Sequence, residues 1–178
     1  MQIEIPRRYF HKIAMMVAAA SGAAKLRAQT PAPAKSSTPA AGGQARRGIH
    51  DGIYYFPGIG SNSGSSREDR ISVTDPFEKH VTRTMDALKK SVESAGCTMD
   101  SILHLEVFTC LHHSDTTPMP TGKAKFDAQT AQYQALNKIY GTYFSAGRAP
   151  SRAYMAVDWI PGDSLVEVVG SARVVNPA

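Results

Sequence analysis

The stretch that decides the fold is APSRAYMAVDWIPGDSLVEV, residues 149–168. Residues 152–160 predict a strand, because apolar side chains recur at every second position on one face, at Ala153, Met155, Val157 and Trp159. Pro-Gly-Asp at residues 161–163 predicts a turn. Residues 165–175 then read as the last strand.

Upstream, residues 53–56 (Ile-Tyr-Tyr-Phe) form another run with high β propensity, which Pro57-Gly58 is expected to end. A polar stretch rich in Gly, Ser and Asn follows at residues 60–66, and then residues 70–73 read Arg-Ile-Ser-Val. This pattern predicts a strand, a long hairpin loop and a short return strand.

A helix is predicted to begin at residues 74–78, where Asp75 can cap, Pro76 suits the first helical position and Glu78 fits a capping box. Gly96 is expected to end it in the left-handed conformation. The apolar stripe at helical spacing consists of Phe77, Val81, Met85, Leu88 and Val92.

A strand is predicted at residues 102–111, with Leu103, Leu105 and Val107 on one face. Residues 116–122, with two prolines, read as a loop. A second helix is expected from Lys123 to about Gly147, with an apolar stripe formed by Phe126, Tyr133, Leu136, Tyr140 and Tyr143.

The resulting order, β-β-α-β-α-β-β, predicts an α+β fold in which two helices cover one face of a mixed sheet. The other sheet face is expected to remain too apolar for water, with Tyr154, Leu165 and Val169 among its residues. Self-association through that face is the simplest way to remove these side chains from water.

The N-terminus is interpreted as a signal peptide at residues 1–28. Arg7-Arg8-Tyr9-Phe10-His11-Lys12 resembles a twin-arginine motif, and a short apolar segment rich in small residues follows it. Residues 29–46, rich in Pro, Ala and Gly, are expected to form a disordered tether, and residues 47–178 the folded domain. The mature protein is therefore expected to be periplasmic or otherwise exported, or cytoplasmic if the leader does not function.

The net charge of +5 does not argue for nucleic-acid binding once the charges are located. Residues 1–28 hold five of the 20 basic and one of the 15 acidic residues, which leaves 15 basic and 14 acidic residues, a net charge of +1. We expect no nucleic-acid partner, and no membrane span after leader removal. Cys97 and Cys110 flank one predicted strand, so two free thiols are expected.

The C-terminal stretch resembles the signature of the Rid (YjgF-type) family of imine and enamine deaminases. Pro150-x-Arg152 opens a strand, Ile160-Pro161 makes a turn, and Glu167 follows the arginine by 15 residues. Asn137-x-x-Tyr140 with Phe144 resembles the family's helical motif. Together the matches span about residues 48–175.

The resemblance implies a chorismate-mutase-like homotrimer with a pocket at each subunit interface and no cofactor or metal. Such proteins convert enamine and imine intermediates to keto acids and ammonia by hydrolysis. Arg152 would hold the substrate carboxylate and Glu167 would hold water and shuttle protons. Asn137, the Gly58 backbone and Tyr154 would line the pocket, and Tyr154, which stands where a small residue or cysteine is usual, is expected to narrow or repolarise it.

Other interpretations stay open. A trimeric protein that binds small carboxylates without catalysis needs only Arg152. A third function, the ribonuclease or translation-inhibitor activity attached to some family members, is disfavoured by the near-neutral charge after residue 28. His112 and His113 read as loop residues, because adjacent histidines on a strand point to opposite faces and no third ligand is suitably spaced.

Overall fold

The structure, a computed structural model, describes residues 48–175, so the predicted signal peptide and tether lie outside the described residues. The strands are β1 (Ile49–His50), β2 (Ile53–Gly60), β3 (Ile102–Thr109), β4 (Ser151–Ala156) and β5 (Val166–Arg173). The helices are α2 (Phe77–Ser94) and α3 (Gly122–Tyr140), with short 3-10 helices η1 (Met99–Ser101) and η2 (Gly141–Tyr143).

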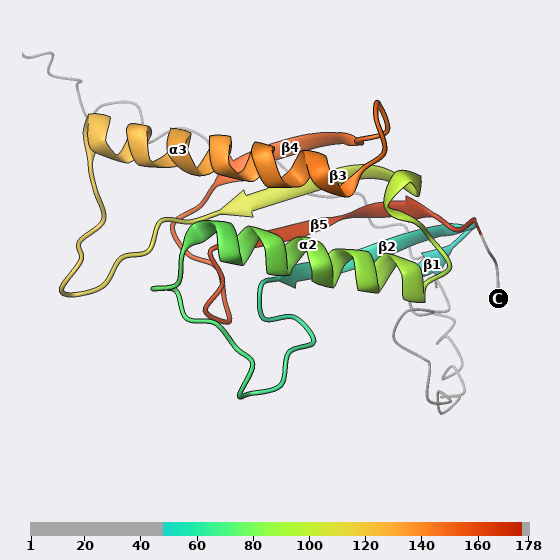
Figure 1. Cartoon of the computed structure of the whole chain (residues 1–178), viewed down its shortest axis with the longest axis horizontal. Helices are drawn as coiled ribbons and strands as arrows, with labels where there is room; N and C mark the ends of the chain where they lie inside the picture. Colours follow the sequence, from blue (N-terminus) through green and yellow to red (C-terminus); the bar gives the residue numbers. More distant parts are fainter. Residues whose placement is uncertain (1–47, 176–178) are drawn as a thin grey trace, which may run out of the picture. The chain divides into compact units, whose positions relative to one another are not determined.

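The strands form one mixed sheet in the order β1-β2-β5-β3-β4. Neighbours are antiparallel except β3 and β4, which are parallel because the crossover through α3 returns the chain in the same direction. Both long helices lie on the same face of the sheet (Figure 1). The predicted α+β class, with two helices on one face of a mixed sheet, is confirmed.

The predicted return strand at residues 70–73 is wrong. The hairpin partner of β2 is β1, and β2 continues through Pro57 to Gly60 with a register shift between Phe56 and Ile59. The irregular pairing there accommodates a proline, which has no N–H to donate. Ile71 pairs with a side chain instead of a strand: Asn62 accepts its N–H at 2.8 Å and donates to its carbonyl at 2.9 Å.

The apolar stripe of α2 is confirmed, since Val81, Met85, Leu88 and Val92 are buried and Phe77 is partly buried. Gly96 takes the left-handed conformation, with φ of 77°. The predicted cap is wrong: Pro76 is the N-cap, and no side chain caps the helix. Asp75 instead accepts the Ser72 N–H at 2.8 Å and pairs with Lys79 at 2.7 Å, which fixes the turn before the helix.

In β3, Leu105 and Val107 face the core as predicted, but Leu103 does not. Leu103 is 42% exposed because the register with β5 shifts between Ile102 and His104, which turns this residue outward. The strand also ends at Thr109, two residues earlier than expected.

The second helix ends at Tyr140, and η2 continues the chain to Tyr143. Leu136 and Tyr140 are buried, as the stripe predicts, but Phe126 is 67% and Tyr133 41% exposed. Phe126 belongs to the N-terminal turns of α3, which extend beyond the strands and have no sheet beneath them to bury an aromatic side chain (Figure 1). Tyr133 lies further along the helix and packs against Tyr154 of β4.

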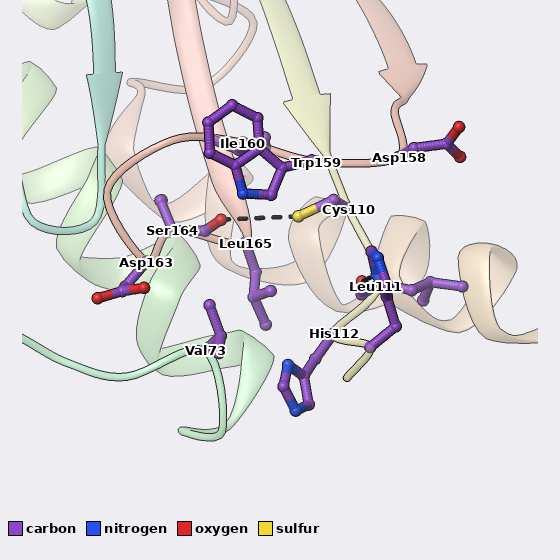
Figure 2. A pocket seen from close by; sticks show the side chains of 11 residues that line it. Val73, Cys110, Leu111, His112, Asp158, Trp159, Ile160, Asp163, Ser164 and Leu165 are labelled. Atoms are coloured by element: carbon purple, nitrogen blue, oxygen red, sulfur yellow. Dashed lines mark hydrogen bonds between the residues drawn. The ribbon is translucent and has the colours of Figure 1, made fainter. Parts of the chain in front are cut away.

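The strand predicted at residues 152–160 spans only Ser151–Ala156, and Trp159 beyond it is 71% exposed. Two of the residues assigned to the open sheet face are misplaced. Tyr154 packs on the helix side, and Leu165 is buried in a small cluster with Cys110 and Ile160 (Figure 2). Val169, which is partly buried, does lie on the open face.

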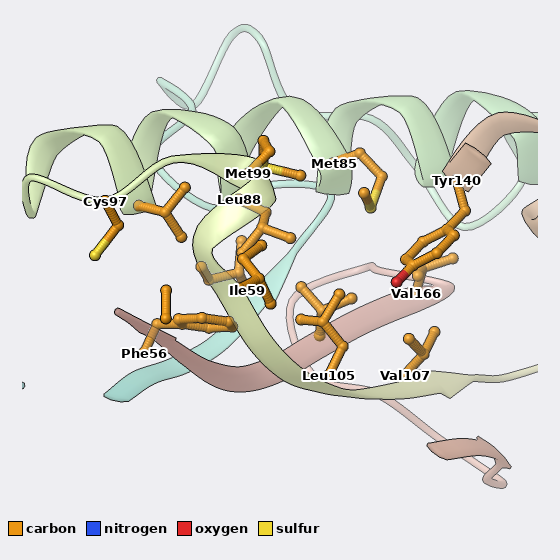
Figure 3. Close-up of a cluster of buried hydrophobic side chains, with 14 of the residues drawn as sticks. Phe56, Ile59, Met85, Leu88, Cys97, Met99, Leu105, Val107, Tyr140 and Val166 are labelled. Carbon is orange, nitrogen blue, oxygen red and sulfur yellow. The ribbon is translucent and has the colours of Figure 1, made fainter. Parts of the chain in front are cut away.

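The main core lies between the two helices and the sheet, with Leu88 and Leu105 fully buried at its centre (Figure 3). Cys97 and Cys110 are buried free thiols on either side of β3. Among residues 48–175, no helix is both long and apolar enough to cross a membrane.

Candidate functional site

Arg152 lies on β4 with its side chain toward α3. Its Nη2 donates a hydrogen bond to Oδ1 of Asn137, which comes from the last turn of α3. The guanidinium carbon lies 4.3 Å from the ring centre of Tyr140 and 5.8 Å from that of Tyr133, within range of cation–π attraction. The structure therefore brings together Arg152 and Asn137, two of the residues predicted from the sequence.

The charge on Arg152 is not balanced by an acidic side chain. None of the salt bridges within the described part of the chain includes this residue, and its contacts are a neutral amide and aromatic rings. Its Nη1 is buried without a hydrogen-bond partner. A buried guanidinium nitrogen without a partner costs free energy, which an anion bound here would recover.

One further tyrosine, Tyr154, packs against Tyr133 beside Arg152. The Tyr154 hydroxyl is 2.8 Å from Oγ1 of Thr109, and its ring packs edge-on against Tyr133 at 4.9 Å between ring centres. Burial raises the pKa of Tyr154, whereas Asn137 and then Arg152 hold the pKa of the more exposed Tyr133 below its usual value. Tyr154, another of the residues predicted from the sequence, thus lies next to the surroundings of Arg152.

Tyr133 is a site residue that the sequence analysis assigned to the core stripe. The signal that could have identified it is its spacing, because it precedes Asn137 by four residues and therefore lies one helical turn away on the same side of α3.

Glu167 does not lie next to Arg152 in the folded chain. On β3, Leu105 is the partner of Arg152 and Phe108 is the partner of Glu167, and the pairing between these positions is regular. Positions three residues apart on a strand face opposite sides of the sheet. Arg152 therefore lies on the helix-covered face and Glu167 on the open face, so one chain does not unite them.

Gly58 lies against Glu167, so the structure brings these two predicted residues together. A β-carbon at position 58 would be 2.7 Å from the carboxyl carbon of Glu167, which is closer than real contacts. Glycine at this position therefore leaves the space that the glutamate side chain occupies.

Glu167 borders a cavity of about 310 Å³ on its own side of the sheet. The walls come from the loop after β2 and from the turn before β5, and the lining residues include Asn62, Arg70, Pro161 and Ser164. The side chain of Asn62 joins these two segments, since it donates to the carbonyls of Ile71 and Gly162 at 2.9 and 3.1 Å.

A buried network of hydrogen bonds around His80 joins the segments that form this cavity. Oγ of Ser61 lies 2.9 Å from Nδ1 of His80 and 3.0 Å from Oγ of Ser164. Nε2 of His80 is 2.9 Å from the carbonyl oxygen of Ser72, so Nε2 donates and Nδ1 accepts. His80 is fully buried, and burial lowers its pKa, which keeps the ring neutral.

This network is not predicted from the sequence. A signal for it is His80 itself, a polar residue next to the apolar stripe of α2 and one turn before Thr84, which is also buried and bonds the Val166 carbonyl.

A second cavity of about 180 Å³ lies at the end of β3 (Figure 2). Cys110 lines it with its thiol directed to the Ser164 carbonyl at 3.6 Å, and burial raises the pKa of this thiol. His112 and His113 also line it, from the loop after β3. Within residues 48–175, no three His, Cys, Asp or Glu side chains converge as metal ligands.

Solved structures with the same arrangement of elements come from several organisms. A protein of the conserved Rid family from Yersinia pestis, YyfA, of unknown function, superposes with a TM-score of 0.53 at 22% identity, over 71% of this chain and 83% of that one. The chain has the Rid fold. RidA from an Antarctic Psychrobacter species superposes with a TM-score of 0.51 at 15% identity, over 71% of this chain and 84% of that one.

A third Rid-fold structure, from Entamoeba histolytica, is provisionally named an endoribonuclease L-PSP. It has a TM-score of 0.52 at 24% identity, and the match covers 70% of this chain and 82% of that one. No family model matches the sequence. At these identities the likeness establishes the Rid fold, and the chemistry has to be argued from the residues.

Proposed function

We propose that this protein is a Rid-type hydrolase that converts imines and enamines of amino acids to keto acids and ammonia. The observation that carries the proposal is the guanidinium of Arg152, which faces neutral partners and has a buried nitrogen without a hydrogen-bond acceptor. A substrate carboxylate would supply both the charge and the acceptor.

The separation of Arg152 from Glu167 implies that a complete site needs two copies of the chain. Arg152, Asn137 and Tyr154 would come from one copy, and Glu167 with Gly58 from its neighbour. The open sheet face carries the exposed apolar side chains of Tyr55 and Met155 together with Val169, and their burial favours a contact between copies. A cyclic trimer satisfies this requirement, because each copy then gives one half to each of two sites.

The proposed reaction uses Arg152 from one copy and Glu167 from its neighbour. Arg152 holds the carboxylate next to the C=N carbon. An enamine first takes up a proton at carbon and gives up one from nitrogen to become the imine. Water then adds to the imine carbon, and the proton that it loses passes through the Glu167 carboxylate to the nitrogen. The hydroxyl of this adduct then gives its proton to the same nitrogen, again through Glu167, while the C–N bond breaks, so that ammonia leaves and the new C=O bond completes the keto acid. The imine carbon is already electrophilic, so these steps need no metal and no organic cofactor.

The alternative is a protein that binds small carboxylates without turnover, since the Arg152 half alone would serve that function. The test is the release of ammonia and keto acid from freshly generated 2-aminoacrylate and 2-iminobutyrate. We expect wild-type protein to accelerate release and both Arg152→Ala and Glu167→Gln to lose most of that acceleration.

Arg148→Ala is the matched control, because it removes an exposed arginine from the loop before β4 and should keep wild-type rates. Turnover by Arg152→Ala equal to that of wild type would contradict the proposal. If the wild-type protein binds keto acids but shows no turnover, the result would support the alternative, a protein that binds small carboxylates without catalysis. The twin-arginine-like leader supports an extracytoplasmic location for this activity.

A further inference from the structure

The cavity beside Glu167 is lined by an arginine, Arg70, which is distinct from Arg152. Arg70 lines it together with Glu167, so the two opposite charges border one cavity of about 310 Å³. Among the residues that the structure describes, Arg70 makes neither a salt bridge nor a side-chain hydrogen bond. Its guanidinium therefore has donors available for a ligand.

The loop holds the backbone of Arg70 in place although its side chain is exposed. On one side, the carbonyl of Asp69 accepts a hydrogen bond from Arg83 at 2.6 Å. On the other side, both backbone groups of Ile71 pair with the buried side chain of Asn62. The hydrogen bonds to residues 69 and 71 thus fix the backbone at Arg70, whose side chain lines the cavity.

The substrate in the proposed function carries one carboxylate, which Arg152 would bind. A second guanidinium beside Glu167 has no role for a substrate with a single acid group. It would be used by a substrate with another acid group, because guanidinium pairs with carboxylate through two parallel hydrogen bonds.

We propose that Arg70 binds a second acid group of the substrate, so that the site prefers imines derived from dicarboxylic amino acids. This inference rests on the proposed function, because Arg152 and Glu167 must share a site with Arg70. The simpler role for Arg70, which is to balance the charge of Glu167, predicts that its loss affects substrates with one and two acid groups equally.

The test compares two keto acids of equal chain length, 2-oxoglutarate and 2-oxopentanoate, which differ in the terminal carboxylate. Their affinities for the full chain are measured by calorimetry, and the turnover of the corresponding imines is measured in parallel. We expect wild type to bind 2-oxoglutarate about fivefold to tenfold more tightly, and Arg70→Gln to reduce this ratio to about one. Arg67→Gln removes another exposed arginine from the same loop, one that does not line the cavity, and should keep the wild-type ratio.

Equal affinity of wild type for the two keto acids, with turnover intact, would overturn this inference and leave the proposed function standing. An unchanged ratio in Arg70→Gln, or an equal loss in Arg67→Gln, would overturn it as well. Failure of wild type both to bind either keto acid and to hydrolyse either imine would overturn the proposed function and this inference together.

Discussion

Arg152 and Glu167 lie on opposite faces of one sheet, 15 residues apart in the chain and on strands that both pair with β3. The spacing between the two residues gives no indication of this separation. It follows from the register, because Arg152 shares a face with Leu105 and Glu167 shares the opposite face with Phe108. The proposed chemistry therefore depends on assembly.

Complementation between two inactive variants tests this dependence. Arg152→Ala and Glu167→Gln should each lose activity as homo-oligomers, because every site then lacks one half. When equal amounts are co-expressed or refolded together, about a quarter of the sites should contain both intact halves, since the copies assort at random in a cyclic assembly. The measurement is ammonia release per site from the mixed protein.

The control is a mixture of wild type with Arg152→Ala, which should retain about half of the sites. Sites in which a single copy supplies both residues would show no recovery in the mixture of the two variants. That result, with the mixed oligomer verified by mass spectrometry, would contradict the intersubunit site.

Gly58→Ala should reduce activity by about tenfold or more while the fold survives. The added β-carbon would lie 2.7 Å from the carboxyl carbon of Glu167, so the glutamate has to move, and small displacements of a reacting group cost rate steeply. Gly141→Ala is the matched control, since a β-carbon there meets nothing within 4 Å. The measurements are kcat/KM and the free energy of unfolding for both variants. Wild-type kcat/KM in Gly58→Ala would show that the position of Glu167 does not matter.

The sequence predicted the architecture better than it predicted the surroundings of the site. Periodicity identified α2 and the strands because burial of one face imposes it, and Leu88 and Leu105 are where the pattern placed them. The alternation of Ile71 and Val73 with polar residues predicts a strand at residues 70–73, where the structure has a loop. The reason is that the Asn62 side chain, nine residues earlier in the chain, forms the hydrogen bonds with the Ile71 backbone that a neighbouring strand would otherwise form.

The same limit applies to the two halves of the site. Asn137 and Arg152 carry a motif, so their association could be predicted. The apolar stripe predicts Tyr133 as a core residue, because helical spacing does not distinguish a side chain in the core from one that packs on Arg152 and Tyr154. The cavity partners of Glu167 come from a loop and a turn that meet only in the folded chain.

The leader gives a prediction that is independent of the enzyme chemistry. If residues 1–28 form a twin-arginine signal peptide, Arg7→Lys with Arg8→Lys should keep the full-length precursor in the cytoplasm of a host with that pathway. The wild-type chain should appear in the periplasmic fraction as a shorter mature form. Lys25→Gln is the control, because it leaves the arginine pair intact. Equal export of the double variant would contradict the twin-arginine interpretation.

The stability of the domain should fall as the pH drops below about 6.5, because His80 is buried as a neutral ring. Burial lowers the pKa of His80 in the folded state, so between the folded and unfolded pKa values the unfolded chain binds more protons. The stabilisation from neutral His80 is therefore complete above the unfolded pKa and is lost as the pH falls towards the folded pKa.

Urea unfolding of wild type and His80→Gln at a series of pH values from 7.5 to 4.5 measures this effect. Carboxylates titrate in both proteins, so the difference between the two curves isolates His80. We expect the free energy of unfolding to fall more steeply in wild type than in His80→Gln as the pH decreases below about 6.5. Folded His80 stays neutral over most of this range and keeps its contacts to Ser61 and Ser72, on the loop that walls the Glu167 cavity, so turnover should decline only at lower pH, near the folded pKa. Parallel stability curves for the two proteins would show that His80 does not titrate on unfolding.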